Sequence, residues 1–223
     1  FTRDMLIANF LGAGPVAEAF LIAFSLPNMF RRLFAEGAFN TAFIPMLSKK
    51  LSRKADAETF SSEALSILIA LLLIITALAE IFMPAFIVAM ASGFSDDNRF
   101  EMSVDFGRIM FPFIVFISIS AFFGGILNAL NRYSVTAAAP LVLNISIILA
   151  LLIANYFQKD YGWAITYAVP IAGFWQLLII LLFLKQQKFS INLKFPKLTG
   201  DVKRLAVIAI PAALAGGVIQ INL

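Results

Sequence analysis

Long apolar stretches without any charge alternate along this chain with short polar segments. Four such stretches cover residues 109–131, 133–158, 161–184 and 205–223. A fifth covers residues 64–79 and continues past a single Glu80 to residue 95. Because a helix of about 20 apolar residues crosses the hydrocarbon core of a bilayer, the pattern predicts an all-α, polytopic transmembrane helix bundle.

The first 48 residues are also largely apolar, but charged side chains interrupt them. The motif LGAGP at residues 11–15 divides this region, because glycine favours the end of a helix and proline its first turn. Pro84 predicts a break in the third helix near the outer interface. Together these features predict a single transmembrane domain over residues 1–223, with helices at residues 1–12, 15–50, 62–92, 104–131, 134–157, 162–186 and 202–223.

Composition agrees with a membrane protein and excludes several kinds of chemistry. Hydrophobic residues make up 61% and charged residues 13% of the chain, against about a quarter charged residues in soluble domains. There is no cysteine and no histidine, which excludes disulfides, thiolate or imidazole metal sites and the usual general base near neutral pH. We therefore expect no enzyme, no cofactor and no bound metal. The chain begins at Phe1 and ends within an apolar run at Leu223. We therefore expect it to be a fragment of a longer protein.

Basic residues are concentrated in alternate loops of the expected bundle. Residues 49–54 contain four, Arg132 follows the fourth expected helix, and residues 185–204 contain six. The loops between them, at residues 11–17, 93–106 and 156–162, contain at most one basic residue each. Because loops rich in lysine and arginine stay in the cytoplasm, we expect these loops and the N-terminal side to be cytoplasmic. The same pattern argues against nucleic-acid binding by the lysine run.

Charged side chains at membrane depth mark the candidate functional site. An ionisable side chain inside the bilayer costs at least about 2.5–3.5 kcal/mol on insertion scales, so it normally faces a cavity or a partner. Guanidinium groups at such depth suit phosphate or pyrophosphate, which they bind bidentately. The candidate substrate-binding residues lie in the first two expected helices: Arg3, Asp4, Glu18, Asn28, Arg31, Arg32 and Glu36.

An internal set of salt bridges is the alternative interpretation of these charges. Arg32 and Glu36 are spaced i, i+4 and would share one face of a helix. Arg3 would pair with Asp4 or with Glu18. The sequence leaves both interpretations open.

Three features outside this region have structural interpretations. Glu80 is expected to be half-solvated near the outer interface. Gly124 and Gly125 are expected to allow close helix packing, and Asn128 and Asn144 to form hydrogen bonds between helices.

The first two expected helices contain a long string that resembles a family signature. It comprises Arg3-Asp4, FLGAG at residues 10–14, EAF at 18–20, LPNMFRRLFAEGAF at 26–39 and AFIP at 42–45. Shorter matches follow, such as ASGF at residues 91–94. Over its whole length the chain resembles the N-terminal half of the MurJ/MviN family in the MOP exporter superfamily.

The resemblance implies the N-terminal lobe of a MATE-like (MOP) fold, whose two lobes enclose a central cavity. It also implies a lipid II flippase of the bacterial cytoplasmic (inner) membrane. Such a protein moves the undecaprenyl-pyrophosphate-linked disaccharide-pentapeptide to the periplasmic leaflet by alternating access. Arg3 and Arg31, with Asp4 and Arg32 beside them, would bind the pyrophosphate, and Glu18 stands where the family usually has aspartate. Coupling to a monovalent cation or to the membrane potential would lie outside this chain, and no oligomer is implied.

Two other classes of function would place charged side chains in a membrane protein. Another MOP-fold exporter, of polyprenyl-linked oligosaccharides or drugs, would share the fold, but the arginines and the long string favour lipid II. A membrane enzyme acting on polyprenyl phosphates would need a carboxylate or histidine cluster at a membrane face, for which the sequence shows no candidate.

Overall fold

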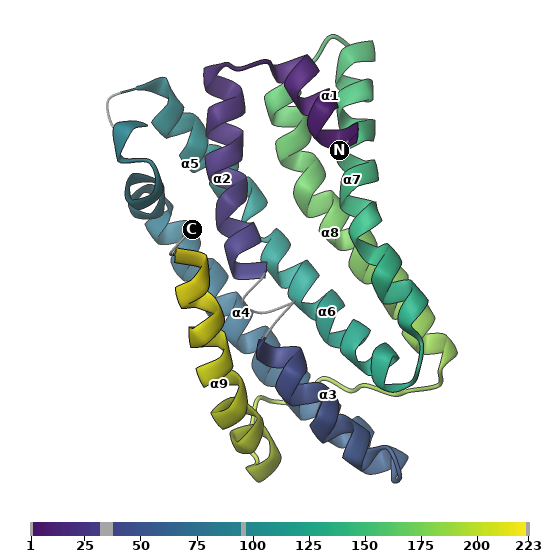
Figure 1. Cartoon of the computed structure of the whole chain (residues 1–223). Coiled ribbons are helices and arrows are strands. Elements are labelled where there is room, and N and C mark those ends of the chain that lie inside the picture. The colour runs from purple at the N-terminus through teal and green to yellow at the C-terminus, as the bar shows by residue number, and fades with distance from the viewer. Residues whose placement is uncertain (1, 32–37, 95–96, 222–223) are drawn as a thin grey trace.

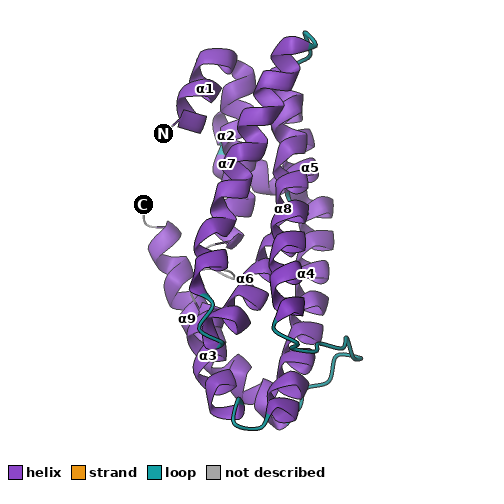
Figure 2. Ribbon diagram, turned by 90° about the vertical axis from the view of Figure 1, so that its right-hand side faces the viewer, coloured by secondary structure: helices purple, strands orange, loops and turns teal. Residues whose placement is uncertain are grey.

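The computed structural model describes residues 2–31, 38–94 and 97–221, and this part of the chain is helical without any strand (Figure 1). The helices run roughly along one long axis, as a second view shows (Figure 2). In chain order the elements are α1 (Thr2–Leu11), α2 (Pro15–Arg31), α3 (Ala38–Lys50), α4 (Lys54–Met90), the short 3-10 helix η2 (Ser92–Phe94), α5 (Asn98–Met110), α6 (Phe113–Ala129), α7 (Tyr133–Tyr156), α8 (Tyr161–Gln186) and α9 (Gly200–Ile221).

Four helical segments of the described chain are long and apolar enough to cross a membrane. They are Lys54–Met90, Asn98–Ala129, Tyr133–Tyr156 and Tyr161–Gln186. Large apolar side chains point away from the bundle on these helices, among them Ile74, which is 58% exposed, and Ile153, which is 56% exposed. An outward apolar face suits lipid tails rather than water. The predicted all-α transmembrane bundle is therefore confirmed.

The turn between the first two helices follows the sequence prediction. α1 ends at Leu11, and Gly12 follows with φ at +64°, a left-handed conformation that glycine adopts without strain. The Gly12 N–H donates to the Ala8 carbonyl at 3.0 Å, and α2 begins at Pro15. The expected second helix over residues 15–50 then corresponds to α2 and α3, with residues 32–37 outside the described part.

Two helices begin earlier than hydropathy predicts. α4 starts at Lys54 rather than at residue 62, because its first turns are polar and face the loop between α8 and α9. α5 starts at Asn98 rather than at residue 104, and Asp97 caps it by accepting a hydrogen bond from the Arg99 N–H at 3.4 Å.

The expected helix over residues 104–131 corresponds to α5 and α6, which together form the helical segment Asn98–Ala129. α5 ends at Met110 and α6 begins at Phe113, so that Phe111 and Pro112 form the junction. Pro112 has no N–H to donate to the Arg108 carbonyl, so one hydrogen bond of the helix is missing there, although Phe111 and Pro112 both keep helical backbone angles. The prediction of one helix overlooked this effect of Pro112, because the flanking residues are uniformly apolar.

α4 is kinked where the sequence predicts a break. Phe82 leaves the helical conformation with φ −97° and ψ 15°, two residues before Pro84. Because Pro84 has no N–H, the carbonyl of Glu80 loses its usual partner one turn ahead. The Arg108 Nε donates to this carbonyl at 3.4 Å from α5. Glu80 itself is half-buried, as expected from the sequence, but its Oε1 is buried and has no hydrogen-bond partner among the described residues.

Small residues let the helices around α6 approach closely. A Cβ atom on Gly124 would lie 2.8 Å from the Thr136 Cγ2, and one on Gly125 would lie 2.8 Å from the Asn40 Oδ1. The close packing expected at this glycine pair is therefore confirmed. Around it, Phe43, Phe60, Phe122 and other buried side chains form the larger apolar cluster, and a second cluster includes Phe20, Phe106 and Phe113.

The basic loops share one end of the bundle. The connections α3–α4, α6–α7 and α8–α9 all lie at the lower end in Figure 1, whereas α1–α2 and α7–α8 connect at the upper end. At the lower end the Lys50 Nζ contacts the Asp201 carboxylate at 2.8 Å. The arrangement agrees with the alternation of charge along the sequence.

The loop between α8 and α9 is attached to α4 by a regular series of hydrogen bonds. The backbone N–H groups of Ser190, Asn192 and Lys194 donate to the Glu58 Oε1 at 2.8 Å, the Ser62 Oγ at 3.1 Å and the Ser66 Oγ at 3.0 Å, respectively. Two extended residues span about 6.6 Å, and four helical residues rise about 6 Å. This match in spacing aligns alternate amides of the loop with successive turns of α4.

Candidate functional site

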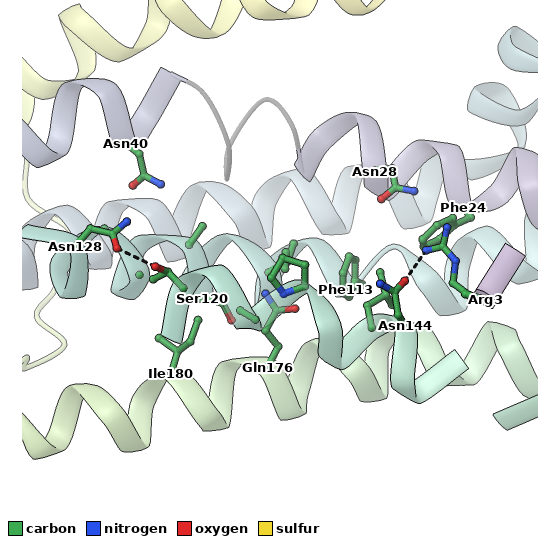
Figure 3. A pocket seen from close by; sticks show the side chains of 18 residues that line it. Arg3, Phe24, Asn28, Asn40, Phe113, Ser120, Asn128, Asn144, Gln176 and Ile180 are labelled. Atoms are coloured by element: carbon green, nitrogen blue, oxygen red, sulfur yellow. Dashed lines mark hydrogen bonds between the residues drawn. The ribbon is translucent and has the colours of Figure 1, made fainter. Parts of the chain in front are cut away.

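A cavity of about 470 Å³ opens between helices from both halves of the described chain (Figure 3). Ligand sites have volumes of about 300–1,000 Å³. The polar side chains of its lining come from α1, α2, α3, α6, α7 and α8 and are Arg3, Asn28, Asn40, Ser120, Asn128, Thr136, Asn144 and Gln176.

Arg3 is the cation among the described residues that line this cavity. Its Nη1 donates to the Asn144 Oδ1 on α7 at 3.1 Å, while its Nε and Nη2 donate to the Asp4 Oδ1 at 2.9 and 2.6 Å. The side chain of Arg3 is 26% exposed and that of Asp4 is 59% exposed. A guanidinium has five N–H donors, so these three bonds leave two donors for a ligand.

Amide and hydroxyl groups continue the polar lining away from Arg3. The Thr136 Oγ1 donates to the Asn128 Oδ1 at 2.8 Å and connects α7 with α6. Together with the bond between Arg3 and Asn144, this confirms the expectation that asparagines form hydrogen bonds between helices. The Ser120 hydroxyl is used within α6, where it donates to the Phe116 carbonyl at 2.7 Å.

Gln176 is a buried member of the lining that the sequence analysis did not select. Only 5% of the residue is exposed, and no described residue forms a hydrogen bond with its carboxamide. Its burial follows from Gly173 one turn earlier, where a Cβ atom would lie 2.7 Å from the Phe113 Cδ2. A glutamine within the charge-free stretch 161–184 was the available signal in the sequence.

The predicted substrate-binding residues have different positions. Arg3 and Asn28 line the cavity, and Asp4 forms a salt bridge with Arg3. Arg31 is the last residue of α2, and its side chain lies outside the described part. Arg32 and Glu36 also lie outside the described residues, so the predicted pair between them and their roles in binding stay predictions.

Glu18 has a partner that the sequence did not indicate. It stands in the first turn of α2 and accepts a hydrogen bond from the Arg99 Nη1 at 2.5 Å. Arg99 thus contacts Glu18, whereas Arg3 contacts Asp4, so the alternative pair of Arg3 with Glu18 does not form in this structure. Glu18 is not among the residues that line the cavity, and its proposed role in binding stays a prediction.

Arg99 joins two helices and the η2 turn at the upper end of the bundle. Its Nε donates to the Asp97 Oδ2 at 2.6 Å, and its guanidinium lies 4.4 Å from the centre of the Phe94 ring. Hydrogen bonding from the Arg99 side chain lowers the pKa of the Asp97 carboxyl below its ordinary value. This cluster connects the N-terminus of α2 to that of α5.

The described residues provide no candidate metal site. No group of three or more aspartate, glutamate, histidine or cysteine side chains gathers among them. The described lining of the cavity instead combines the Arg3 guanidinium with neutral amides and hydroxyls. Such a lining suits an anion attached to a group rich in hydroxyls and amides.

Comparison with known proteins identifies the family. The sequence profile described as "Lipid II flippase MurJ" matches residues 7–223, nearly the whole chain. The chain belongs to the MurJ family. The predicted resemblance is therefore confirmed.

Several MurJ proteins match over the full length of this chain. A "Probable lipid II flippase MurJ" of Rhizobium meliloti is 44% identical, and one of Rhizobium tropici is 42% identical. The alignments cover 100% of this chain and 43% of each of these relatives. The "Lipid II flippase MurJ" of Burkholderia cenocepacia is 36% identical over 99% of this chain. The chain thus spans less than half the length of these MurJ proteins, which are named as lipid II flippases.

A solved MurJ structure has the same fold. The "Lipid II flippase MurJ, inward closed conformation" superposes with a TM-score of 0.79 at 23% sequence identity, covering 99% of this chain and 45% of that protein. The arrangement of helices described above is therefore that of a MurJ segment.

Proposed function

We propose that this chain forms one lobe of a lipid II flippase and that Arg3 binds the pyrophosphate of the substrate in the cavity. The observation that carries the proposal is the position of the Arg3 guanidinium, which lines the cavity and is held from two sides by Asp4 and Asn144. Family membership and the names of the relatives support the substrate.

The chemistry of Arg3 suits a pyrophosphate. Its planar fork presents parallel donors to phosphate oxygens, and hydrogen bonds between ionised groups contribute about 1.5–3 kcal/mol. Asp4 offsets the charge of Arg3 when no substrate is bound. A pyrophosphate with more negative charge than one carboxylate would compete with Asp4 for the same donors. On the basis of the family resemblance, we propose that Arg31 and Arg32 also bind the pyrophosphate.

Transport requires more than this chain. Alternating access would occur between this lobe and a second lobe. The chain spans only 43% of the length of the two Rhizobium relatives. Coupling to a monovalent cation or to the membrane potential is proposed to reside outside the chain. We propose the bacterial cytoplasmic membrane as the location, with the end that carries the basic loops in the cytoplasm.

Lipid II exposure at the outer face of the cytoplasmic membrane tests the proposal. Cells that depend on the full-length protein would carry wild type, Arg3→Ala or the control Arg132→Ala. Arg132 is a matched arginine that donates from its Nε to the Gln187 Oε1 at 3.3 Å, outside the cavity. We expect Arg3→Ala to abolish most exposure at a normal protein level, and Arg132→Ala to retain it. Unchanged exposure in Arg3→Ala cells would overturn the role of Arg3.

A further inference from the structure

Gln176 is a buried carboxamide of the cavity that forms no hydrogen bond with another described residue. It is 5% exposed, lines the cavity, and has no hydrogen-bond partner among the described residues. In the view of Figure 3 it lies between the pair formed by Arg3 and Asn144 on one side and Asn128 on the other. Buried polar side chains almost always have a partner, and one that lacks it calls for an explanation.

Two other amides of the cavity lining have hydrogen-bond partners within the protein. Asn144 accepts from Arg3, and Asn128 accepts from Thr136. The same lining includes the apolar side chains of Phe113 and Ile180, which cannot satisfy the two N–H donors and the carbonyl oxygen of Gln176. Since the described residues supply no partner, a molecule that enters the cavity would supply one for the Gln176 carboxamide.

The chemistry of a carboxamide defines this partner. A neutral amide donates and accepts at once, as do hydroxyl groups and other amides, whereas a phosphate only accepts. Arginine binds phosphate far better than an amide does. We propose that Gln176 binds the neutral, hydroxyl- and amide-bearing part of the substrate headgroup while Arg3 binds the pyrophosphate. This inference rests on the proposed function and divides the cavity into two subsites.

Gly173 positions Gln176 for this role. At Gly173, which has no side chain, α8 packs closely against Phe113 of α6. The next turn of α8 therefore places Gln176 in the cavity lining. Residue 186 at the end of the same helix is also a glutamine, but it is exposed and lies outside the cavity. The two glutamines of α8 therefore form a matched pair for substitution.

Binding of two ligands to the purified full-length protein tests the subsite. Both ligands carry a pyrophosphate, but lipid II also carries the disaccharide-pentapeptide, which undecaprenyl pyrophosphate lacks. Gln176→Leu should weaken lipid II binding about tenfold, the effect of one or two lost hydrogen bonds. It should leave undecaprenyl pyrophosphate binding within about twofold. Gln186→Leu should change neither affinity.

Thermal unfolding of the same variants separates a binding role from a structural one. Leucine has nearly the volume of glutamine and no unpaired polar atom, so Gln176→Leu should unfold at the same temperature as wild type or above it. The inference would be overturned if Gln176→Leu weakened the binding of both ligands equally or of neither. A lower unfolding temperature of Gln176→Leu would also overturn it. Arg3→Ala separates the two proposals, because it should weaken the binding of both lipid II and undecaprenyl pyrophosphate. If it weakens neither, the pyrophosphate assignment fails independently of Gln176.

Discussion

The Arg3 Nη1 donates to the Asn144 Oδ1 at 3.1 Å and connects α1 to α7 across 141 residues of sequence. Asn144 thereby fixes one side of the guanidinium, while Asp4 holds the other. An arginine fixed in this way loses less side-chain entropy when it binds an anion. Asn144 is therefore expected to act on substrate binding through Arg3.

Replacing Asn144 by leucine should weaken the binding of undecaprenyl pyrophosphate about two- to tenfold, because one hydrogen bond that orients Arg3 is lost. Titration of the purified full-length protein measures this affinity. Asn155→Leu is the control, because Asn155 lies on the same helix, accepts from the Tyr161 hydroxyl at 3.0 Å and is exposed. Equal effects of the two substitutions would contradict the orienting role of Asn144.

Gly173→Ala should lower the free energy of unfolding by about 1–3 kcal/mol, as overpacking of a buried contact does. The added Cβ would lie 2.7 Å from the Phe113 Cδ2 and 3.1 Å from the Phe116 Cβ, and Phe113 is fully buried. The gain in helix propensity from glycine to alanine offsets at most about 1 kcal/mol. Gly93→Ala is the control, because nothing lies within 4 Å of its added Cβ. Thermal unfolding curves measure both variants, and only Gly173→Ala is expected to unfold at a lower temperature than wild type.

Removing the hydroxyls of Ser62 and Ser66 together should release the loop between α8 and α9. The amides of Asn192 and Lys194 would lose their acceptors, and their hydrogen exchange should accelerate about two- to tenfold. Exchange of the peptide that covers residues 187–199, followed by mass spectrometry, measures the effect. Ser61→Ala should leave it unchanged, because the buried Ser61 hydroxyl has no partner among the described residues. Unaltered exchange in the double variant would show that the loop is held by other contacts.

The cluster around Arg99 predicts a dependence on pH. The pKa of Asp97 is lowered in the folded state by its hydrogen bond from Arg99. The hydrogen bond between Asp97 and Arg99 therefore stabilises the fold fully above the ordinary aspartate pKa of about 3.9. This stabilisation is lost as the pH falls through the lower pKa that Asp97 has in the folded state. Unfolding temperatures of wild type and Asp97→Asn should differ slightly at neutral pH and converge in acid. Asp105→Asn, at an exposed position of α5, serves as the control. A difference that persisted in acid would contradict this assignment.

The sequence predicted the helices best where a charge-free stretch ends at polar residues. The expected helix over residues 134–157 corresponds to α7 (Tyr133–Tyr156), and the one over 162–186 corresponds to α8 (Tyr161–Gln186). Prediction was poorer at the polar start of α4, because those residues bond to a loop rather than to lipid. It was also poorer at Pro112, where a local backbone effect interrupts a uniformly apolar stretch.

The site was predicted only in part, for physical reasons that individual residues show. Arg3 and Asn28 were found because polar or charged groups inside a membrane need a cavity or a partner. Gln176 was missed because one neutral amide hardly changes the hydropathy of an apolar helix. The partner of Glu18 was missed because Arg99 lies 81 residues away and is brought close only by the packing of α2 against α5.

The most direct test of the central claim is a structure of the full-length protein with lipid II bound. The account predicts the pyrophosphate within hydrogen-bond distance of the Arg3 guanidinium, about 2.7–2.9 Å between nitrogen and oxygen, with the sugar and peptide groups directed toward Gln176. A pyrophosphate bound elsewhere, with Arg3 still donating only to Asp4 and Asn144, would contradict it.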